Sequence, residues 1–160
     1  MIQLYPSIGM QVFRLSRARF ADTLSGVGAA LKGARWNSAG IEMVYTAGNR
    51  SLAMAEVAVH LSLGMLPDDY MMLTIDIPAE VAIKKIDEKA LPEDWRVFPF
   101  PTSTQKWGDD FVRENAFSVM QVPSVVTQGD YNYLLNPLHK DFPKIKIVDR
   151  VPFPFDARMI

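Results

Sequence analysis

Residues 33–56 read GARWNSAGIEMVYTAGNRSLAMAE, and the rest of the chain can be interpreted around this stretch. Residues 35–40 predict the end of a strand that runs into a turn. Residues 41–47 are rich in β-forming side chains, which is typical of a short strand. Residues 48–51 predict a turn, with Ser51 near the N-cap of a largely apolar helix over 52–61 that ends towards Gly64. The stretch therefore predicts strand, turn and buried helix in close succession.

Glu56 falls inside the apolar run of the predicted helix. An isolated carboxylate is very costly to bury, so this side chain needs either a partner or a cavity. The same stretch supplies a cation, Arg35, and a phenol, Tyr45. A carboxylate, a cation and a phenol that converge among small residues are typical of a functional site. The alternative is that Glu56 is a salt-bridged structural residue or lies at the edge of the apolar face of the helix.

Composition limits the classes of function that are compatible with the chain. Its 160 residues fit one domain, and its 49% hydrophobic and 22% charged residues are ordinary for a soluble globular protein. A net charge of −1 gives no electrostatic case for direct binding of nucleic acid. The absence of cysteine excludes thiol catalysis and disulfides, and two histidines argue against a His-rich metal site. No apolar run reaches membrane-spanning length, so we expect a cytoplasmic protein.

The first strand introduces a second candidate cation. Residues 1–9 differ in character from the rest and are expected to be a leader or an alternative start, which leaves a domain over 10–160. In the predicted strand over 10–15, Phe13 and Leu15 share one face and Arg14 lies on the other. If Phe13 and Leu15 face the core, Arg14 points either to solvent or into a cleft.

The remaining pattern predicts an α+β protein: a single compact domain with mostly antiparallel sheets and a few helices. Strands are expected over 70–77, 81–86, 119–122 and 145–149, and a last one with Phe153 and Phe155. A helix is expected over 102–115 with its N-cap near Thr102 or Ser103, and residues 21–32 predict a loop or a broken helix. The proline-broken, aromatic segment 97–103 predicts a connector, whose exposed aromatics could also serve as a lid or a partner surface.

Several familiar motifs are absent, and the remaining polar candidates have structural alternatives. The chain has no glycine-rich nucleotide loop, phosphate loop or nucleophile elbow. Ser124 follows a proline and is either a polar cleft group or a structural residue at a strand break. Asn136 precedes Pro137 in a common turn dipeptide. His139 lies in the following loop and is expected to form hydrogen bonds there rather than to act as a base.

A set of segments stands out in order along the chain, from Met10 to the C-terminus. The segments are Phe13-Arg14, residues 33–40, 44–47 and 52–56, Gly108-Asp109, residues 122–126, residues 132–137 with His139, Asp141 and Phe142, and Phe155-Asp156 with Arg158. This ordered set resembles the RES domain family, the toxin half of bacterial toxin–antitoxin pairs. The chief departure is Asp110-Phe111, where the family often has Trp or another large residue after Gly-Asp.

The resemblance implies a compact domain distantly related to the ADP-ribosyltransferase fold, with a cleft that takes NAD as substrate. It implies cleavage of the nicotinamide–ribose bond, by water as a glycohydrolase, by phosphate as a phosphorylase, or with transfer of ADP-ribose to a specific host protein, and growth arrest as the result. The family's core site corresponds to Arg35, Tyr45 and Glu56. Arg14, Ser124 and Asn136 fall where family members have further cleft residues.

The chemistry of NAD cleavage suits these assignments. Loss of nicotinamide passes through an oxocarbenium-like transition state, which a carboxylate such as Glu56 can stabilise. An arginine fork matches phosphate oxygens, which suits Arg35 and Arg14. Tyr45 can stack on the nicotinamide or ribose and form a hydrogen bond through its hydroxyl. Ser124 and Asn136 can hold ribose or phosphate oxygens, and no metal is required.

The resemblance also implies a partner. RES toxins pair with an Xre-type helix-turn-helix antitoxin whose C-terminal part occludes the cleft, so DNA binding would belong to the antitoxin. A toxin–toxin dimer within the complex is also compatible with the family. A second class of function is also compatible with these residues, namely a non-catalytic module that binds NAD or ADP-ribose. Water, phosphate and protein acceptors would all use the same cleft, so the residues leave the acceptor open.

Overall fold

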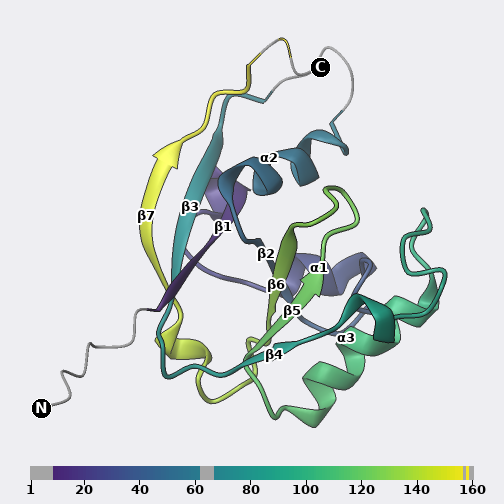
Figure 1. Ribbon diagram of the computed structural model, residues 1–160. Helices are drawn as coiled ribbons and strands as arrows, with labels where there is room; N and C mark the ends of the chain where they lie inside the picture. Colours follow the sequence, from purple (N-terminus) through teal and green to yellow (C-terminus); the bar gives the residue numbers. More distant parts are fainter. Residues whose placement is uncertain (1–8, 62–66, 157, 159–160) are drawn as a thin grey trace, which may run out of the picture.

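The computed structural model describes residues 9–61, 67–156 and 158, in which helices pack against one mixed sheet (Figure 1). Residues 1–8 of the expected leader, and the expected helix end at Gly64, lie outside this range. The elements in chain order are β1 (Met10–Arg17), η1 (Ala18–Phe20), α1 (Val27–Lys32), β2 (Val44–Ala47), α2 (Arg50–Ala58), β3 (Tyr70–Ile77), β4 (Ile83–Lys85), η2 (Glu88–Ala90), α3 (Thr102–Glu114), β5 (Val119–Pro123), β6 (Tyr131–Leu135), η3 (Phe142–Lys144) and β7 (Lys146–Pro152).

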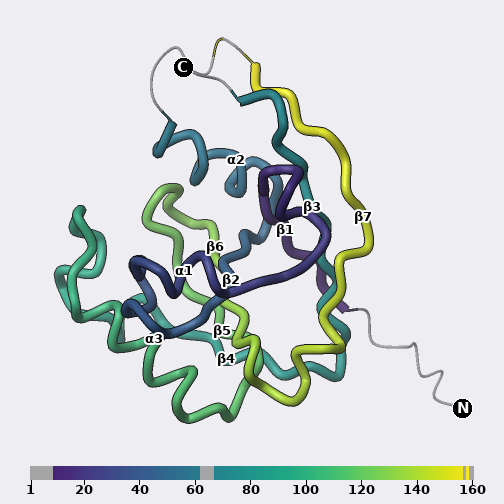
Figure 2. Tube along the Cα trace, turned by 180° about the vertical axis from the view of Figure 1, so that it is seen from behind, coloured from purple at the N-terminus to yellow at the C-terminus, as the bar shows by residue number. Residues whose placement is uncertain are grey.

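The strands form a seven-stranded sheet in the order β4-β5-β6-β2-β1-β3-β7. Within the described residues only β4 and β5 pair in parallel, and every other neighbouring pair is antiparallel. The predicted class, α+β with a mostly antiparallel sheet, is therefore confirmed. Seen from either side, α1 and α3 lie together next to β5 and β6, whereas α2 lies apart from them (Figures 1 and 2).

Strand β1 is covered on both faces. Val12 is fully buried in one apolar cluster with Leu73 and Ile75 of β3. Phe13 and Leu15, on the other face, pack with Leu52 and Met72 in a second cluster that includes α2. Because α2 covers the Phe13 face of the strand, burial on both faces leaves β1 with little solvated surface.

The central stretch folds as predicted in outline but differs at four boundaries, one of which is the end of the predicted helix: α2 ends at Ala58 rather than at Leu61. Residues 35–40 form no strand; they make a turn with a single bridge between Ala34 and Asn37. Strand β2 begins only at Val44. Helix α2 starts at Arg50, and its N-cap is Asn49 rather than Ser51, because the Asn49 side chain accepts a hydrogen bond of 2.8 Å from the backbone N–H of Leu52.

Two further predictions need correction. The described residues 153–156 form no strand. Phe153 and Phe155 instead stack edge to face, and Phe155 stacks in the same way on Tyr70. Helix α3 starts at Thr102 with Pro101 as its N-cap residue and no capping side chain. The connector prediction for residues 97–103 is confirmed up to the start of α3, and none of the helices within the described ranges is long and apolar enough to cross a membrane.

Candidate functional site

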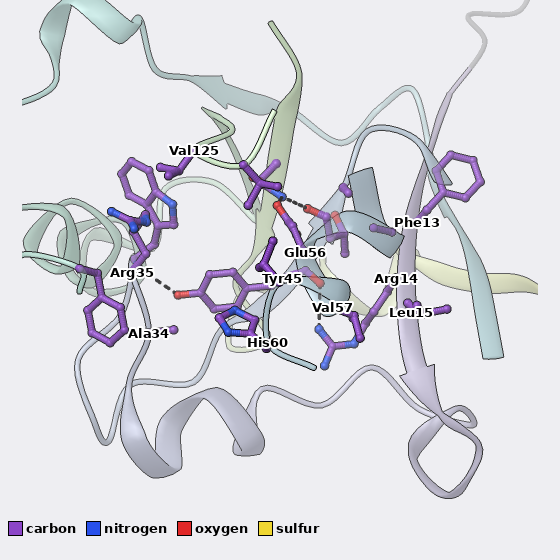
Figure 3. A pocket seen from close by; sticks show the side chains of 18 of the residues that line it. Phe13, Arg14, Leu15, Ala34, Arg35, Tyr45, Glu56, Val57, His60 and Val125 are labelled. Carbon is purple, nitrogen blue, oxygen red and sulfur yellow. Dashed lines mark hydrogen bonds between the residues drawn. The ribbon is translucent and has the colours of Figure 1, made fainter. Parts of the chain in front are cut away.

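A single cleft of about 970 Å³ collects four of the predicted site residues. Strands β1 and β2 supply Arg14 and Tyr45, helix α2 supplies Glu56, and the turn before β2 supplies Arg35. Glu56 and Tyr45 lie between the two arginines (Figure 3). This volume is at the upper end of the range for small-molecule sites. The fold therefore brings together the carboxylate, the phenol and both cations that the sequence singled out.

Glu56 is held in the cleft by an amide from strand β6. Its Oε1 accepts a hydrogen bond of 2.6 Å from Nδ2 of Asn132 on β6, and the same Nδ2 donates to the carbonyl oxygen of Thr46 at 3.2 Å. Burial raises the pKa of the Glu56 carboxyl to about 7, and the hydrogen bond from Asn132 opposes that rise. Glu56 therefore titrates near neutral pH. A carboxyl of this kind is suited to acid–base catalysis or to stabilising a positive charge.

Tyr45 uses its hydroxyl to hold the turn that carries Arg35. The hydroxyl donates to Oδ1 of Asn37 at 2.5 Å and accepts from the backbone N–H of Trp36 at 3.1 Å. Asn37 is fully buried, and its Nδ2 donates to the carbonyl oxygen of Ile41 at 2.9 Å. Burial raises the pKa of the Tyr45 hydroxyl well above its usual range. The ring of Tyr45 lines the cleft while its hydroxyl is committed to the turn.

Helix α3 clamps the same turn from outside the cleft. Asp109 accepts hydrogen bonds from the backbone N–H of Ser38 at 2.9 Å and from its hydroxyl at 2.5 Å. A Cβ atom added at Gly108 would lie 1.5 Å from the carbonyl oxygen of Trp36, so only glycine allows the helix to approach this closely. Gly108 and Asp109 thus fix the turn that presents Arg35.

Arg35 connects the turn to the aromatic connector. Its Nη1 donates to the carbonyl oxygens of Trp95 at 2.7 Å and Val97 at 3.0 Å. Burial lowers the pKa of the guanidinium. Among the described residues, no carboxylate lies within salt-bridge distance of the Arg35 guanidinium, and no residue accepts a hydrogen bond from its other two nitrogens. Arg35 therefore has donors that an anionic ligand can use.

Arg14 is the more deeply buried cation of the pair. Its Nη1 donates to the carbonyl oxygen of Tyr45 at 2.8 Å, and burial lowers its pKa. In the part of the chain that the structure describes, Arg14 has no salt bridge. The two arginines thus place uncompensated positive charge on both sides of Glu56 (Figure 3).

Ser124 and Asn136 are predicted site residues that do not line the cleft. The Ser124 hydroxyl accepts from the backbone N–H groups of Val126 at 3.1 Å and Thr127 at 3.0 Å, so it shapes a turn whose neighbours Val125 and Val126 do line the cleft. Asn136 donates from Nδ2 to Oδ1 of Asn115 at 2.9 Å. Its side chain thereby ties the end of β6 to the end of α3.

Sequence reasoning left out several residues of the site. Asn132 and Asp109 lie in segments that match the family, but the sequence alone indicates no role for either. A polar side chain inside the apolar strand Tyr131–Leu135 is a signal that would have found Asn132. The cleft is also lined by His60, Phe98 and Phe100. His139 accepts a hydrogen bond from the backbone N–H of Asp141 at 3.0 Å, as expected of a loop residue. No cluster of three metal-ligating side chains occurs among the described residues.

The fold and the cleft define a single-domain α+β protein with a candidate small-molecule site. Its fold is similar to that of a chain in the crystal structure of the M. tuberculosis MbcT–MbcA toxin–antitoxin complex, with a TM-score of 0.75 and 18% identity over 93% of this chain and 86% of that one. The model of the RES domain family matches residues 11–156. The chain belongs to the RES domain family.

Two relatives are similar over almost their whole length. Toxin Res of Photorhabdus laumondii is 38% identical over 94% of this chain and 97% of its own. The Prs ADP-ribosylating toxin of a Sphingobium species is 35% identical over 91% of each chain. The predicted membership of the family is thereby confirmed.

Proposed function

We propose that this chain is the toxin of a toxin–antitoxin system and that it consumes NAD in the cytoplasm by cleaving the nicotinamide–ribose bond, which arrests growth. The observation that carries the proposal is the Glu56 carboxyl between Arg14 and Arg35 in one cleft. The names of the relatives support the toxin class, and the name of the Sphingobium relative supports NAD as the source of ADP-ribose.

Glu56 is the group proposed to act at the reacting ribose. The bond between the ribose C1′ and the nicotinamide nitrogen breaks, and its electron pair leaves with neutral nicotinamide. The positive charge that develops on the ribose is stabilised by the Glu56 carboxylate. The acceptor oxygen then forms the new bond to C1′ and gives its proton to solvent. Asn132, through its 2.6 Å hydrogen bond, favours the ionised form of Glu56 that this role needs.

Arg35 is proposed to hold the diphosphate of NAD. Arg35 retains donors beyond the Nη1 that contacts the connector, and a guanidinium matches phosphate oxygens in fixed geometry. Arg14 adds a second buried charge on the other side of Glu56. The Tyr45 ring offers a flat wall for the nicotinamide or ribose. The reaction needs no metal ion.

A second candidate is transfer of ADP-ribose to a specific host protein. It is favoured by the name of the Sphingobium relative, an ADP-ribosylating toxin that is 35% identical to this chain. The same carboxylate and arginines would serve this reaction, because only the acceptor differs. A module that binds NAD or ADP-ribose without cleaving it is the non-catalytic alternative.

An antitoxin of the Xre helix-turn-helix type is the proposed partner, seated so that it occludes the cleft. Support comes from the similar fold of a chain that was solved in a toxin–antitoxin complex. A toxin–toxin dimer within the complex of this chain and its antitoxin is part of the same proposal. The net charge of −1 is consistent with DNA binding by the partner rather than by this chain.

The deciding experiment follows nicotinamide release from NAD by the purified, antitoxin-free protein, with and without phosphate. Release without phosphate identifies a glycohydrolase, and release that requires phosphate identifies a phosphorylase. If folded protein releases nothing, cell lysate and labelled NAD are added and proteins are examined for ADP-ribose. Absence of both nicotinamide release and labelled protein contradicts an enzymatic role. Glu56→Gln serves as the inactive control.

A further inference from the structure

Two phenylalanines are exposed at the cleft without an apolar partner that buries them. Phe98 is 75% exposed and Phe100 is 39% exposed, and both line the same cleft as Glu56. They belong to the connector between η2 and α3. Water contact with large aromatic rings is unfavourable, so rings left open inside a concave site are typical of surfaces that receive a ligand.

The base of this connector is firmly attached to the domain. Arg35 donates to the carbonyl oxygens of Trp95 and Val97, and the Trp95 side chain is only 5% exposed. The guanidinium of Arg96 lies 4.7 Å from the centre of the Trp95 ring. The Phe98 and Phe100 rings are therefore presented by an anchored backbone, which reduces the conformational entropy lost on binding.

An apolar surface and a cation lie at the same end of the cleft. Val97 precedes Phe98 directly, so the hydrogen bond from Arg35 to its carbonyl oxygen keeps the aromatic segment next to the guanidinium. Val125 lies on the Arg35 side in Figure 3, and Val126 lines the cleft with 41% exposure. The Arg35 end thus combines flat aromatic rings, aliphatic side chains and a charged donor.

We propose that this end of the cleft is the subsite for the adenine base of the dinucleotide, with Phe98 and Phe100 contacting the base and Arg35 the diphosphate. The inference rests on the proposed function, and it adds the direction in which the substrate lies. A heteroaromatic base gains favourable stacking on aromatic side chains, largely independently of its hydrogen-bonding edge.

The order of groups along the cleft agrees with the order of groups in NAD. The reacting ribose and nicotinamide must lie at Glu56, the diphosphate comes next, and the adenosine half comes last. In Figure 3 Tyr45 separates Glu56 from Arg35, and the hydrogen bond from Arg35 to the carbonyl oxygen of Val97 holds the Phe98 segment next to the guanidinium. At the Arg14 end, by contrast, Phe13 is 8% exposed and lies under the guanidinium of Arg50 at 4.4 Å, so its ring is already covered.

The test compares NAD with nicotinamide mononucleotide, which has the same scissile bond but lacks the adenylyl half. For a variant with both Phe98→Ala and Phe100→Ala, we expect kcat/KM for NAD to fall by about tenfold or more, mainly through KM, and kcat/KM for the mononucleotide to stay within about twofold. Phe98→Trp keeps an aromatic surface and should retain activity on NAD. Phe20→Ala is the matched control, because Phe20 is 59% exposed and does not line the cleft.

Binding gives a readout that does not depend on cleavage. Titration calorimetry with ADP-ribose and with ribose 5-phosphate should show that the double variant loses affinity for ADP-ribose only. Equal losses on NAD and on the mononucleotide, or unchanged binding of ADP-ribose, would overturn the subsite and leave the rings to contact a protein partner. If the wild-type protein cleaves neither substrate, the proposed reaction fails. Loss of ADP-ribose binding in the double variant would still support the subsite, and no measurable binding by the wild type would overturn it.

Discussion

Nδ2 of Asn132 lies 2.6 Å from Oε1 of Glu56, and this contact joins β6 to α2 at the cleft. It gives the buried carboxylate the polar partner that its position requires. It also lowers the pKa of the Glu56 carboxyl, whereas burial raises it. The balance of these two effects determines how much of the proposed catalytic carboxylate is ionised at neutral pH.

The first prediction concerns the carboxylate itself. Glu56→Gln keeps an oxygen that can accept from Asn132 but removes the negative charge, so we expect nicotinamide release to fall by at least about a hundredfold while the fold is retained. Circular dichroism and release of nicotinamide from NAD are the measurements. A folded variant with full activity would contradict a catalytic role of Glu56.

The second prediction is a pH profile of activity. Because burial raises the pKa of Glu56 to about 7, the ionised fraction increases as the pH rises through neutrality. We expect kcat/KM for NAD to increase between about pH 6 and about pH 8 and then to level off. A profile that is flat over this range would show that ionisation of Glu56 does not limit the reaction.

The third prediction concerns the pH dependence of stability, which follows from the same pKa of Glu56. The carboxyl has a pKa of about 7 in the folded protein, above its ordinary value of 4.5, so the folded state binds the proton more tightly. The contribution of Glu56 to the free energy of unfolding should therefore fall as the pH rises from 4.5 to about 7 and change little above it. Glu56→Gln should remove this loss, which makes the variant more stable than the wild type above neutrality by about 1 to 3 kcal/mol.

Urea unfolding of both proteins at several pH values measures that difference. The wild type and Glu56→Gln should come closest below the ordinary pKa of a glutamate and diverge as the pH rises. An equal stability difference at every pH would contradict the titration of Glu56.

The sequence predicted the residues that line the cleft better than it predicted the residues that position them. Glu56, Arg35 and Tyr45 fall within one short stretch, and a carboxylate inside an apolar helical run is visible without a structure. Asn132 and Asp109 were not assigned, because each contacts the stretch from more than 70 positions away, 76 for Asn132 to Glu56 and 71 for Asp109 to Ser38. Hydrophobic periodicity carries no information on such pairings.

The fold errors have local physical reasons. Asn49 and Ser51 are both residue types that cap helices, and only the backbone geometry selects the first. Residues 35–40 form a turn rather than a strand because side chains of Tyr45 and Asp109 hydrogen-bond to backbone N–H groups that a strand neighbour would otherwise pair. Phe153 and Phe155 alternate as a strand would, but their rings pack at the Tyr70 end of β3 instead.

The fourth prediction separates binding from catalysis. Arg35→Ala removes a charged donor from the proposed diphosphate site and also releases the connector from Trp95 and Val97. We expect KM for NAD to rise by an amount equivalent to about 1.5 to 3 kcal/mol. Arg19→Ala is the control, since this exposed arginine contacts the Phe20 ring and does not line the cleft. Unchanged kcat and KM in Arg35→Ala would contradict the assignment.

The fifth prediction concerns the close contact of α3 with the turn that presents Arg35. In Gly108→Ala the added Cβ would lie 1.5 Å from the carbonyl oxygen of Trp36, so the helix or the turn must move, and we expect a loss of about 3 kcal/mol or more in the free energy of unfolding. Gly28→Ala is the matched control, because Gly28 lies within α1 and has nothing within 4 Å of the added atom. Alanine is the better helix former there, so Gly28→Ala should stabilise by about 0.5 to 1 kcal/mol. Denaturant unfolding compares the two variants, and an equal, small effect of both would show that α3 does not need glycine to clamp the turn.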